Sequence, residues 1–127
     1  MYATKDVPMY EVEFYEDKNG SQPVKEVLIE LRDRARTSKD ARIQYQKILT
    51  HIRALETYGT RIGEPQVKHL DGNLWEIRPL AHRIIFFYWR NNKFVLLHHF
   101  IKKTQKTPAK EIEQATRNLK DFLERNK

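Results

Sequence analysis

The chain has 127 residues, with 24 Lys and Arg, 17 Asp and Glu, and no cysteine. This length suits one domain with a sizeable core, and the lack of cysteine excludes disulfides and thiolate metal sites. No apolar run approaches the ~20 residues of a membrane span, and Met1–Asp6 lacks the apolar core of a signal peptide. We therefore expect a single cytoplasmic domain, residues 1–127, without membrane contact.

The net charge of +7 is concentrated in one third of the chain. Residues 66–110 contain nine basic side chains and two acidic ones, whereas basic and acidic side chains balance over the rest. A concentrated excess of this kind indicates a surface for a polyanion such as nucleic acid. A solvated basic surface without a partner is the alternative interpretation.

The first half of the chain predicts a strand followed by two helices. Residues 10–15 alternate between apolar and polar side chains, as in a half-buried strand. An apolar stripe then predicts a helix that is capped by Ser21 and ends near Thr37. A second stripe between a cap at Ser38 and a stop at Gly59 predicts an antiparallel partner helix.

The second half predicts a sheet and a final helix. We expect an irregular segment at 59–72, strands at 74–79, 82–89 and 93–101, a tight turn at 91–92, and a helix capped by Thr107 that runs to about Arg125. In the second and third of these strands, both the odd-numbered and the even-numbered residues are apolar, which indicates that both faces of the sheet are covered. The order βααβββα predicts an α+β fold with a mostly antiparallel sheet, an N-terminal helical hairpin and a C-terminal helix.

Basic side chains cluster near the ends of the predicted strands. The candidates are Lys68, His69, Arg78, Arg83, His98, His99, Lys102, Lys103 and Lys106, with His51 and His82 as weaker ones. Because consecutive antiparallel strands bring the end of one beside the start of the other, we expect Arg83 and residues 99–103 to be neighbours, with Arg78 nearby. The structural alternatives are an Arg78–Glu76 ion pair and core histidines at 98 and 99.

A site rich in cations and poor in acids suits cleavage of RNA without a metal. The ribose 2′-OH is a tethered nucleophile that needs a base, cations around the phosphorus and an acid for the departing 5′-oxygen. DNA lacks this hydroxyl. Two acidic side chains within residues 66–110 are few for a two-metal nuclease, so we expect no metal and no cofactor.

Several segments are distinctive when taken together. Residues 67–70 read VKHL, 74–79 read LWEIRP, 83–85 read RII, and 96–108 read LLHHFIKKTQKTP. From about Tyr10 to Leu123 the chain resembles the phage-derived Gp49-like, HigB-type toxins of the RelE/ParE superfamily. The resemblance implies a RelE-like fold with the same element order.

The resemblance also implies a function and partners. Such toxins of type II toxin–antitoxin systems are ribosome-dependent mRNA endoribonucleases (mRNA interferases). They are neutralised by a HigA-like helix-turn-helix antitoxin, which implies a heterotetrameric complex. The motifs place Lys68, Arg78, Arg83, Lys102 and Lys103 in the site. With the strand-end geometry added, we predict catalytic roles for Arg78, Arg83, Lys102, Lys103 and His99, and RNA binding by Lys68, His69, Lys106 and Arg90.

One departure leaves the proton-transfer groups open. Many relatives carry a tyrosine late in the site, but no tyrosine follows Tyr88 here, so the base or acid is a lysine, a histidine or another group. Two other functions compete with the endoribonuclease: a ParE-like inhibitor of DNA gyrase, and an RNA-binding module that does not cut.

Overall fold

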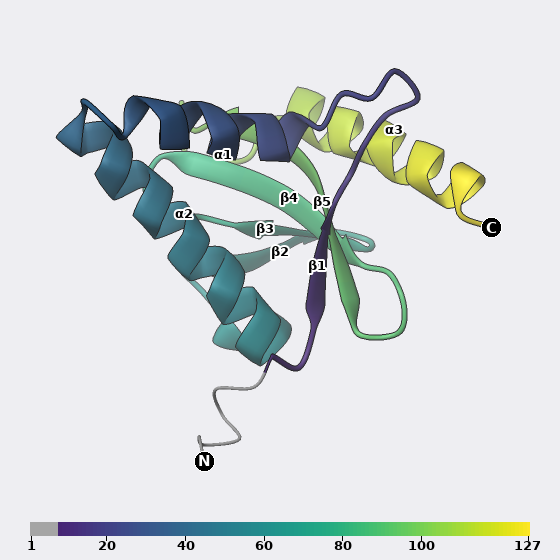
Figure 1. Cartoon of the computed structure of the whole chain (residues 1–127). Coiled ribbons are helices and arrows are strands. Elements are labelled where there is room, and N and C mark those ends of the chain that lie inside the picture. The colour runs from purple at the N-terminus through teal and green to yellow at the C-terminus, as the bar shows by residue number, and fades with distance from the viewer. Residues whose placement is uncertain (1–7) are drawn as a thin grey trace, which may run out of the picture.

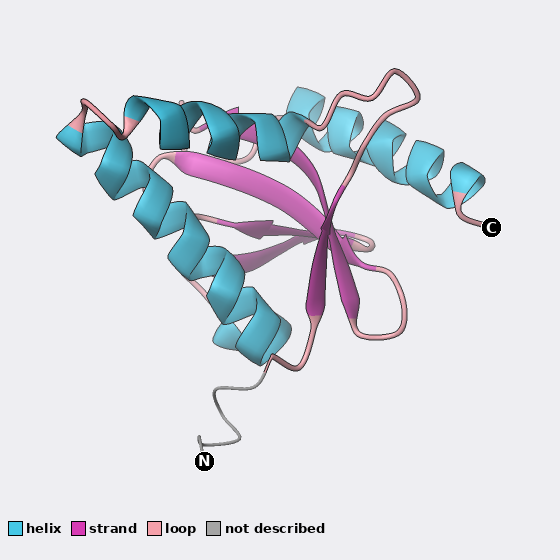
Figure 2. Ribbon diagram, viewed as in Figure 1, coloured by secondary structure: helices cyan, strands magenta, loops and turns pink. Residues whose placement is uncertain are grey.

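The computed structural model describes residues 8–127, so the Met1–Asp6 segment considered for a signal peptide lies outside the described residues. The elements in chain order are β1 (Glu11–Phe14), α1 (Pro23–Arg34), α2 (Lys39–Tyr58), a 3-10 helix (Gly59–Ile62), β2 (Val67–Asp71), β3 (Leu74–Ile77), β4 (His82–Tyr88), β5 (Lys93–Ile101) and α3 (Ala109–Arg125). A central sheet is flanked by the α1–α2 hairpin on one side and by α3 on the other (Figures 1 and 2). Within the described part, no helix combines the length and apolar composition that a membrane span needs.

The five strands form one sheet in the order β1-β5-β4-β3-β2. β1 runs parallel to β5, and the other three pairs are antiparallel. The predicted α+β class with a mostly antiparallel sheet is therefore confirmed. This topology places β4 in the centre, so its residues are buried almost throughout.

The helical hairpin forms where the sequence predicts it. The Ser38 hydroxyl caps α2 by accepting from the backbone N–H of Ala41 at 3.1 Å, and Gly59 ends the helix with φ of 63°. The first helix differs at its ends. Its N-cap is Gln22 rather than Ser21, because the carboxylate of Glu26 accepts from the Gln22 N–H at 2.8 Å, and α1 stops at Arg34 rather than near Thr37.

Each face of the sheet buries its own apolar cluster. Ile84 and Phe86 of β4 pack with the apolar stripes of α1 and α2. Ile85 and Phe87, which point to the opposite face, pack with Ala115 and Phe122 of α3. The expectation that both faces are covered is therefore confirmed.

The prediction that segment 59–72 is irregular is wrong. The segment contains the 3-10 helix and β2, which pairs with β3 through a turn at Gly72, so the element order is βααββββα. The residues of β2 alternate weakly, since it is a short edge strand with only Val67 buried, and sequence periodicity gives such a strand little signal.

The remaining boundaries shift by one or two residues. β3 ends at Ile77 rather than at 79, β4 at Tyr88 rather than at 89, and β5 matches its predicted range. The turn between them places Asn91 and Asn92 at positive φ, as predicted. The cap of α3 is Pro108 and not Thr107, because the Thr107 hydroxyl donates to a side chain of the sheet instead.

Candidate functional site

Two arginines lie at the end of the β3–β4 hairpin. Arg78 follows β3, and Arg83 is the second residue of β4, with Leu80 at positive φ in the turn between them. The Arg83 side chain is only 6% exposed, and its Nη1 donates to the backbone oxygens of Leu80 and His82, each at 2.8 Å. These bonds compensate the cost of burying a cation and hold its position. Burial and then the Arg78 charge lower the pKa of Arg83.

A buried carboxylate accompanies the arginines. Glu76 of β3 is 1% exposed, its Oε1 accepts from the Thr107 hydroxyl at 2.9 Å, and its Oε2 lies 3.5 Å from Arg78 Nε. The expected alternative, an Arg78–Glu76 ion pair, therefore exists. The pair is not a well-aligned hydrogen bond: among the described residues, Arg78 Nε is the one buried side-chain polar atom without a hydrogen-bond partner. One carboxylate thus faces two guanidinium groups.

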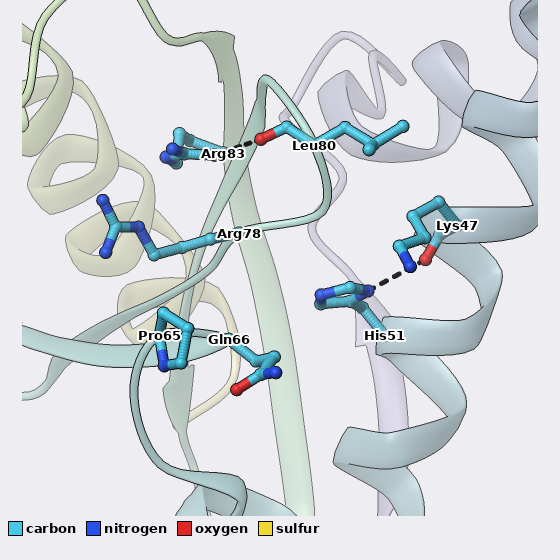
Figure 3. Close-up of a pocket in the computed structure, with 7 residues that line it drawn as sticks. All are labelled: Lys47, His51, Pro65, Gln66, Arg78, Leu80 and Arg83. Carbon is cyan, nitrogen blue, oxygen red and sulfur yellow. Dashed lines mark hydrogen bonds between the residues drawn. The ribbon is translucent and has the colours of Figure 1, made fainter.

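The arginines form one wall of an open cleft of about 360 Å³. Its lining consists of Lys47, His51, Pro65, Gln66, Arg78, Leu80 and Arg83. In Figure 3, Lys47 and His51 extend from α2 on one side of the cleft and the two arginines stand on the other, with the arginine side chains directed away from α2.

Lys47 and Gln66 line the cleft although the sequence did not point to them. His51, one of the weaker candidates from the sequence, lines it as well. Lys47 and His51 are four positions apart on α2, and this helical spacing is the signal that could have revealed them. His51 Nδ1 donates to the Lys47 carbonyl at 3.0 Å, since a carbonyl only accepts. Burial lowers the pKa of His51, so its imidazole is neutral near pH 7.

The exposed lysines are anchored beside the arginines. Lys102, Lys103 and Lys106 all lie in the segment between β5 and α3 and are exposed. The Lys102 N–H donates to the Ala81 carbonyl at 2.8 Å, and the other end of the segment is held by the Thr107–Glu76 bond. Both ends of the segment are thus tied to the β3–β4 hairpin that carries the arginines.

Lys68 joins the same face from the neighbouring strand. It was expected just before the first strand of the sheet, but it lies within β2 and pairs in register with Glu76. Directly opposed residues of an antiparallel pair lie on the same face. Lys68, Glu76 and Arg78 therefore belong to one side of the sheet, the side covered further along by α3.

Two predicted RNA-binding residues, His69 and Arg90, lie apart from this cluster. His69 is exposed, its Nε2 lies 2.8 Å from the Gly72 carbonyl, and its ring contacts Trp75 edge-on. Arg90 lies beyond the opposite end of β4, with its guanidinium 4.3 Å from the Trp89 ring centre. Because β4 is 7 residues long, Arg90 is roughly 20 Å along the sheet from Arg83.

His99 has the right place in sequence but points to the other face. The expected neighbour relation holds for the backbone, where Arg83 pairs with Phe100. The His99 side chain instead contacts His82 at 2.8 Å, and His82 contacts Gln44 of α2 at 2.7 Å. The placement of His99 beside the arginines is therefore wrong. Burial is the main cause that lowers its pKa to about 4.

His98, the other histidine of the pair, contacts α3. Its Nε2 lies 2.7 Å from Glu111 Oε1, so it ties β5 to the first turn of that helix.

Over residues 8–127, no three His, Cys, Asp or Glu side chains are grouped so that they could hold a metal ion.

Comparison with known proteins identifies a family. No curated protein is significantly similar to the chain. Residues 38–120 match the family model described as "Phage derived protein Gp49-like (DUF891)". The match spans α2, the whole of β2 to β5 and most of α3, and so includes the cation cluster. The chain therefore belongs to the phage-derived Gp49-like family, which is part of the RelE/HigB-like toxin–antitoxin group.

Proposed function

We propose that the protein is a toxin of HigB type, one domain in extent, that cuts mRNA on the ribosome. The family supports a toxin role and an antitoxin partner. The observation that carries the enzymatic proposal is the pair of guanidinium groups, Arg78 and Arg83, that line one wall of the open cleft beside the exposed lysines of segment 102–106. A phosphate oxygen is an acceptor that a guanidinium binds well.

The chemistry follows from the charges that gather around these two arginines. Arg78 and Arg83 stabilise the charge that develops on the phosphorus oxygens, and Lys68 with the lysines of segment 102–106 holds the flanking phosphates. The 2′-OH gives up its proton to a base and attacks its own neighbouring phosphate, so the bond to the 5′-oxygen breaks, that oxygen takes up a proton from an acid, and a 2′,3′-cyclic phosphate remains. His51 is the neutral imidazole of the adjoining cleft and supplies one proton-transfer group.

Dependence on the ribosome follows from what the site contains. It offers cations and few groups that could orient a flexible RNA strand in line for attack. Positioning alone is worth ~7–11 kcal/mol in well-oriented reactions, and an A-site codon held by the ribosome supplies it. We accordingly expect negligible cleavage of naked RNA.

The test is a ribosome-bound mRNA with a single 2′-methoxy group on the nucleotide 5′ of the scissile phosphate. We expect the unmodified twin to be cut and the modified mRNA to resist, with EDTA acting only through ribosome integrity. Equal cleavage of both would exclude attack by the 2′-OH. Uncut mRNA together with inhibited supercoiling would instead favour the gyrase function, and RNA binding without any cleavage would favour the binding module.

The partner and compartment belong to the same proposal. We infer a HigA-like helix-turn-helix antitoxin that binds this toxin in a heterotetramer in the cytoplasm, where ribosomes and mRNA are available. An acidic segment of the antitoxin would complement the exposed lysines of segment 102–106 beside the two arginines. Size-exclusion chromatography with light scattering on the co-expressed pair tests the stoichiometry.

A further inference from the structure

Glu76 is a buried carboxylate to which the chemistry above assigns no part. Its two oxygens have different partners: Oε1 accepts from Thr107 Oγ1 at 2.9 Å, and Oε2 lies 3.5 Å from Arg78 Nε. Its charge also raises the pKa of Arg83, against the burial and the Arg78 charge that lower it. Because a buried carboxylate is costly unless it is paired, these contacts are what allow Glu76 to remain in the sheet.

Thr107 connects Glu76 to the lysine-bearing segment. Lys102 begins this segment with a backbone bond to Ala81, and Thr107 ends it with the side-chain bond to Glu76. Within it, the Thr104 hydroxyl donates to the Lys106 carbonyl at 2.7 Å. The segment is therefore fixed at its first and last residues, and the second of these attachments depends on Glu76.

The two guanidinium groups also depend on this carboxylate. Arg78 and Arg83 repel each other, and each is attracted by Glu76. Removing the negative charge leaves both cations close together in a partly buried place, where repulsion is weakly screened. They would then separate or reorient, and the distance between the arginines and the lysines would no longer be set.

We propose that Glu76 is a positioning residue of the endoribonuclease: one carboxylate oxygen orients Arg78 and the other holds the segment of Lys102–Lys106 through Thr107. This inference rests on the proposed function. Glu76 itself is buried and contacts no RNA, so it acts only by holding the cations in one arrangement before the substrate arrives.

The principal test replaces Glu76 with glutamine in the full-length protein. Glu76→Gln keeps an oxygen that can accept from Thr107 and removes the charge. We expect the maximal rate of A-site mRNA cleavage to fall by up to about 10²-fold, the cost of small misplacements of catalytic groups. The ribosome concentration that gives half the maximal rate should stay constant or fall, because the variant is more positive and binds RNA at least as well.

Asp121→Asn is a matched control. Like Glu76, Asp121 of α3 has a hydroxyl and an arginine as partners: it accepts from the Tyr15 hydroxyl at 2.6 Å and from Arg125 Nη2 at 2.8 Å. It lies towards the C-terminal end of the helix, away from the proposed site. We expect both kinetic parameters of this variant to equal those of the wild type. If Glu76→Gln cuts at the wild-type rate, or loses rate and ribosome binding together in proportion to its loss of thermal stability, the inference is overturned.

Thr107 provides a second variant should Glu76→Gln fail to fold. Thr107→Val removes the hydroxyl donor, and we expect a smaller fall in the maximal rate that Thr107→Ser restores. Equal rates for the valine and serine variants would contradict the proposed attachment.

An NMR measurement separates this inference from the proposed function. The Nε–H signals of Arg78 and Arg83 should shift or broaden in Glu76→Gln and remain unchanged in Asp121→Asn. Absence of cleavage by the wild-type protein would remove the proposed function. The arginine signals would then still decide the role of Glu76, since unchanged signals in Glu76→Gln overturn it.

Discussion

Acidification should destabilise the fold through the histidine pair between α2 and the sheet. His82 Nε2 lies 2.7 Å from Gln44 Oε1, so this nitrogen carries the hydrogen, and His82 Nδ1 accepts from His99 Nε2 at 2.8 Å. This chain of bonds requires His82 to be neutral at Nδ1, whereas burial and the neighbouring histidines are what oppose a charge on His99. A proton added at His82 Nδ1 would place two N–H groups against each other, which breaks the connection between β4 and β5 side chains.

The magnitude follows from the pKa of His99. An unfolded histidine titrates near 6.5, whereas burial and the charges of His82 and His98 lower the folded pKa to about 4. Between these values the unfolded chain binds more protons, so the free energy of unfolding falls as the pH falls. The loss from this group reaches at most about 3 kcal/mol and is complete below pH 4. The lowered pKa values of His82 and His51 act in the same direction.

Urea unfolding of the full chain at intervals between about pH 7.5 and 4 measures this loss. The informative variant is His99→Gln, which keeps an N–H near the position of Nε2 but does not titrate, so its stability should depend less on pH. His69→Gln, which alters an exposed histidine on the edge strand β2, should leave the wild-type slope unchanged. The reasoning fails if His99→Gln and the wild type lose stability equally between pH 6.5 and 4.

Three further outcomes are expected. Gly59→Ala should lose about 1–3 kcal/mol of stability in urea unfolding, because φ is 63° and the added Cβ would lie 3.0 Å from the Tyr10 ring. Gly20→Ala is the control: Gly20 also has positive φ but open space around it, so its loss measures the backbone part alone. Arg78→Ala should remain folded by circular dichroism and lose about 10²–10³ in cleavage rate, and full toxicity of the folded variant would refute its role. Arg83→Ala should also lose stability, because two backbone carbonyls lose their donor. Expression of the chain alone should stop growth, and co-expression of an antitoxin encoded beside it should restore growth. Abundant active protein without a partner or a growth defect would contradict the toxin assignment.

The parts of the fold that were predictable are those with strong periodicity. The stripes of α1 and α2, the cap at Ser38 and the stop at Gly59 all occur where the sequence predicts them, because each depends on local chemistry. The range of β5 also matches. β2 was missed because its stability comes from pairing with β3 and not from its own pattern.

The predicted site residues divide along the same line. Arg78, Arg83, Lys102 and Lys103 gather at one end of the β3–β4 hairpin, since antiparallel connections between consecutive strands require this. Their contacts were less predictable. A threonine before a proline has the pattern of a helix cap, and only the tertiary structure shows that Thr107 donates to a buried carboxylate 31 positions earlier.

The position of His99 depends on one inserted residue in β5. In a regular strand, residues 95, 97 and 99 would share a face, and His99 would lie on the side of Arg83. The register shifts between Ile85 and Phe86, so Leu97 is the extra residue of a β-bulge, and parity changes after it. His98 then faces α3 and contacts Glu111, while His99 faces α2 and contacts His82. The same change places Phe100 opposite Arg83, so the bulge separates a neutral histidine network that stabilises the fold from the cations proposed to bind RNA.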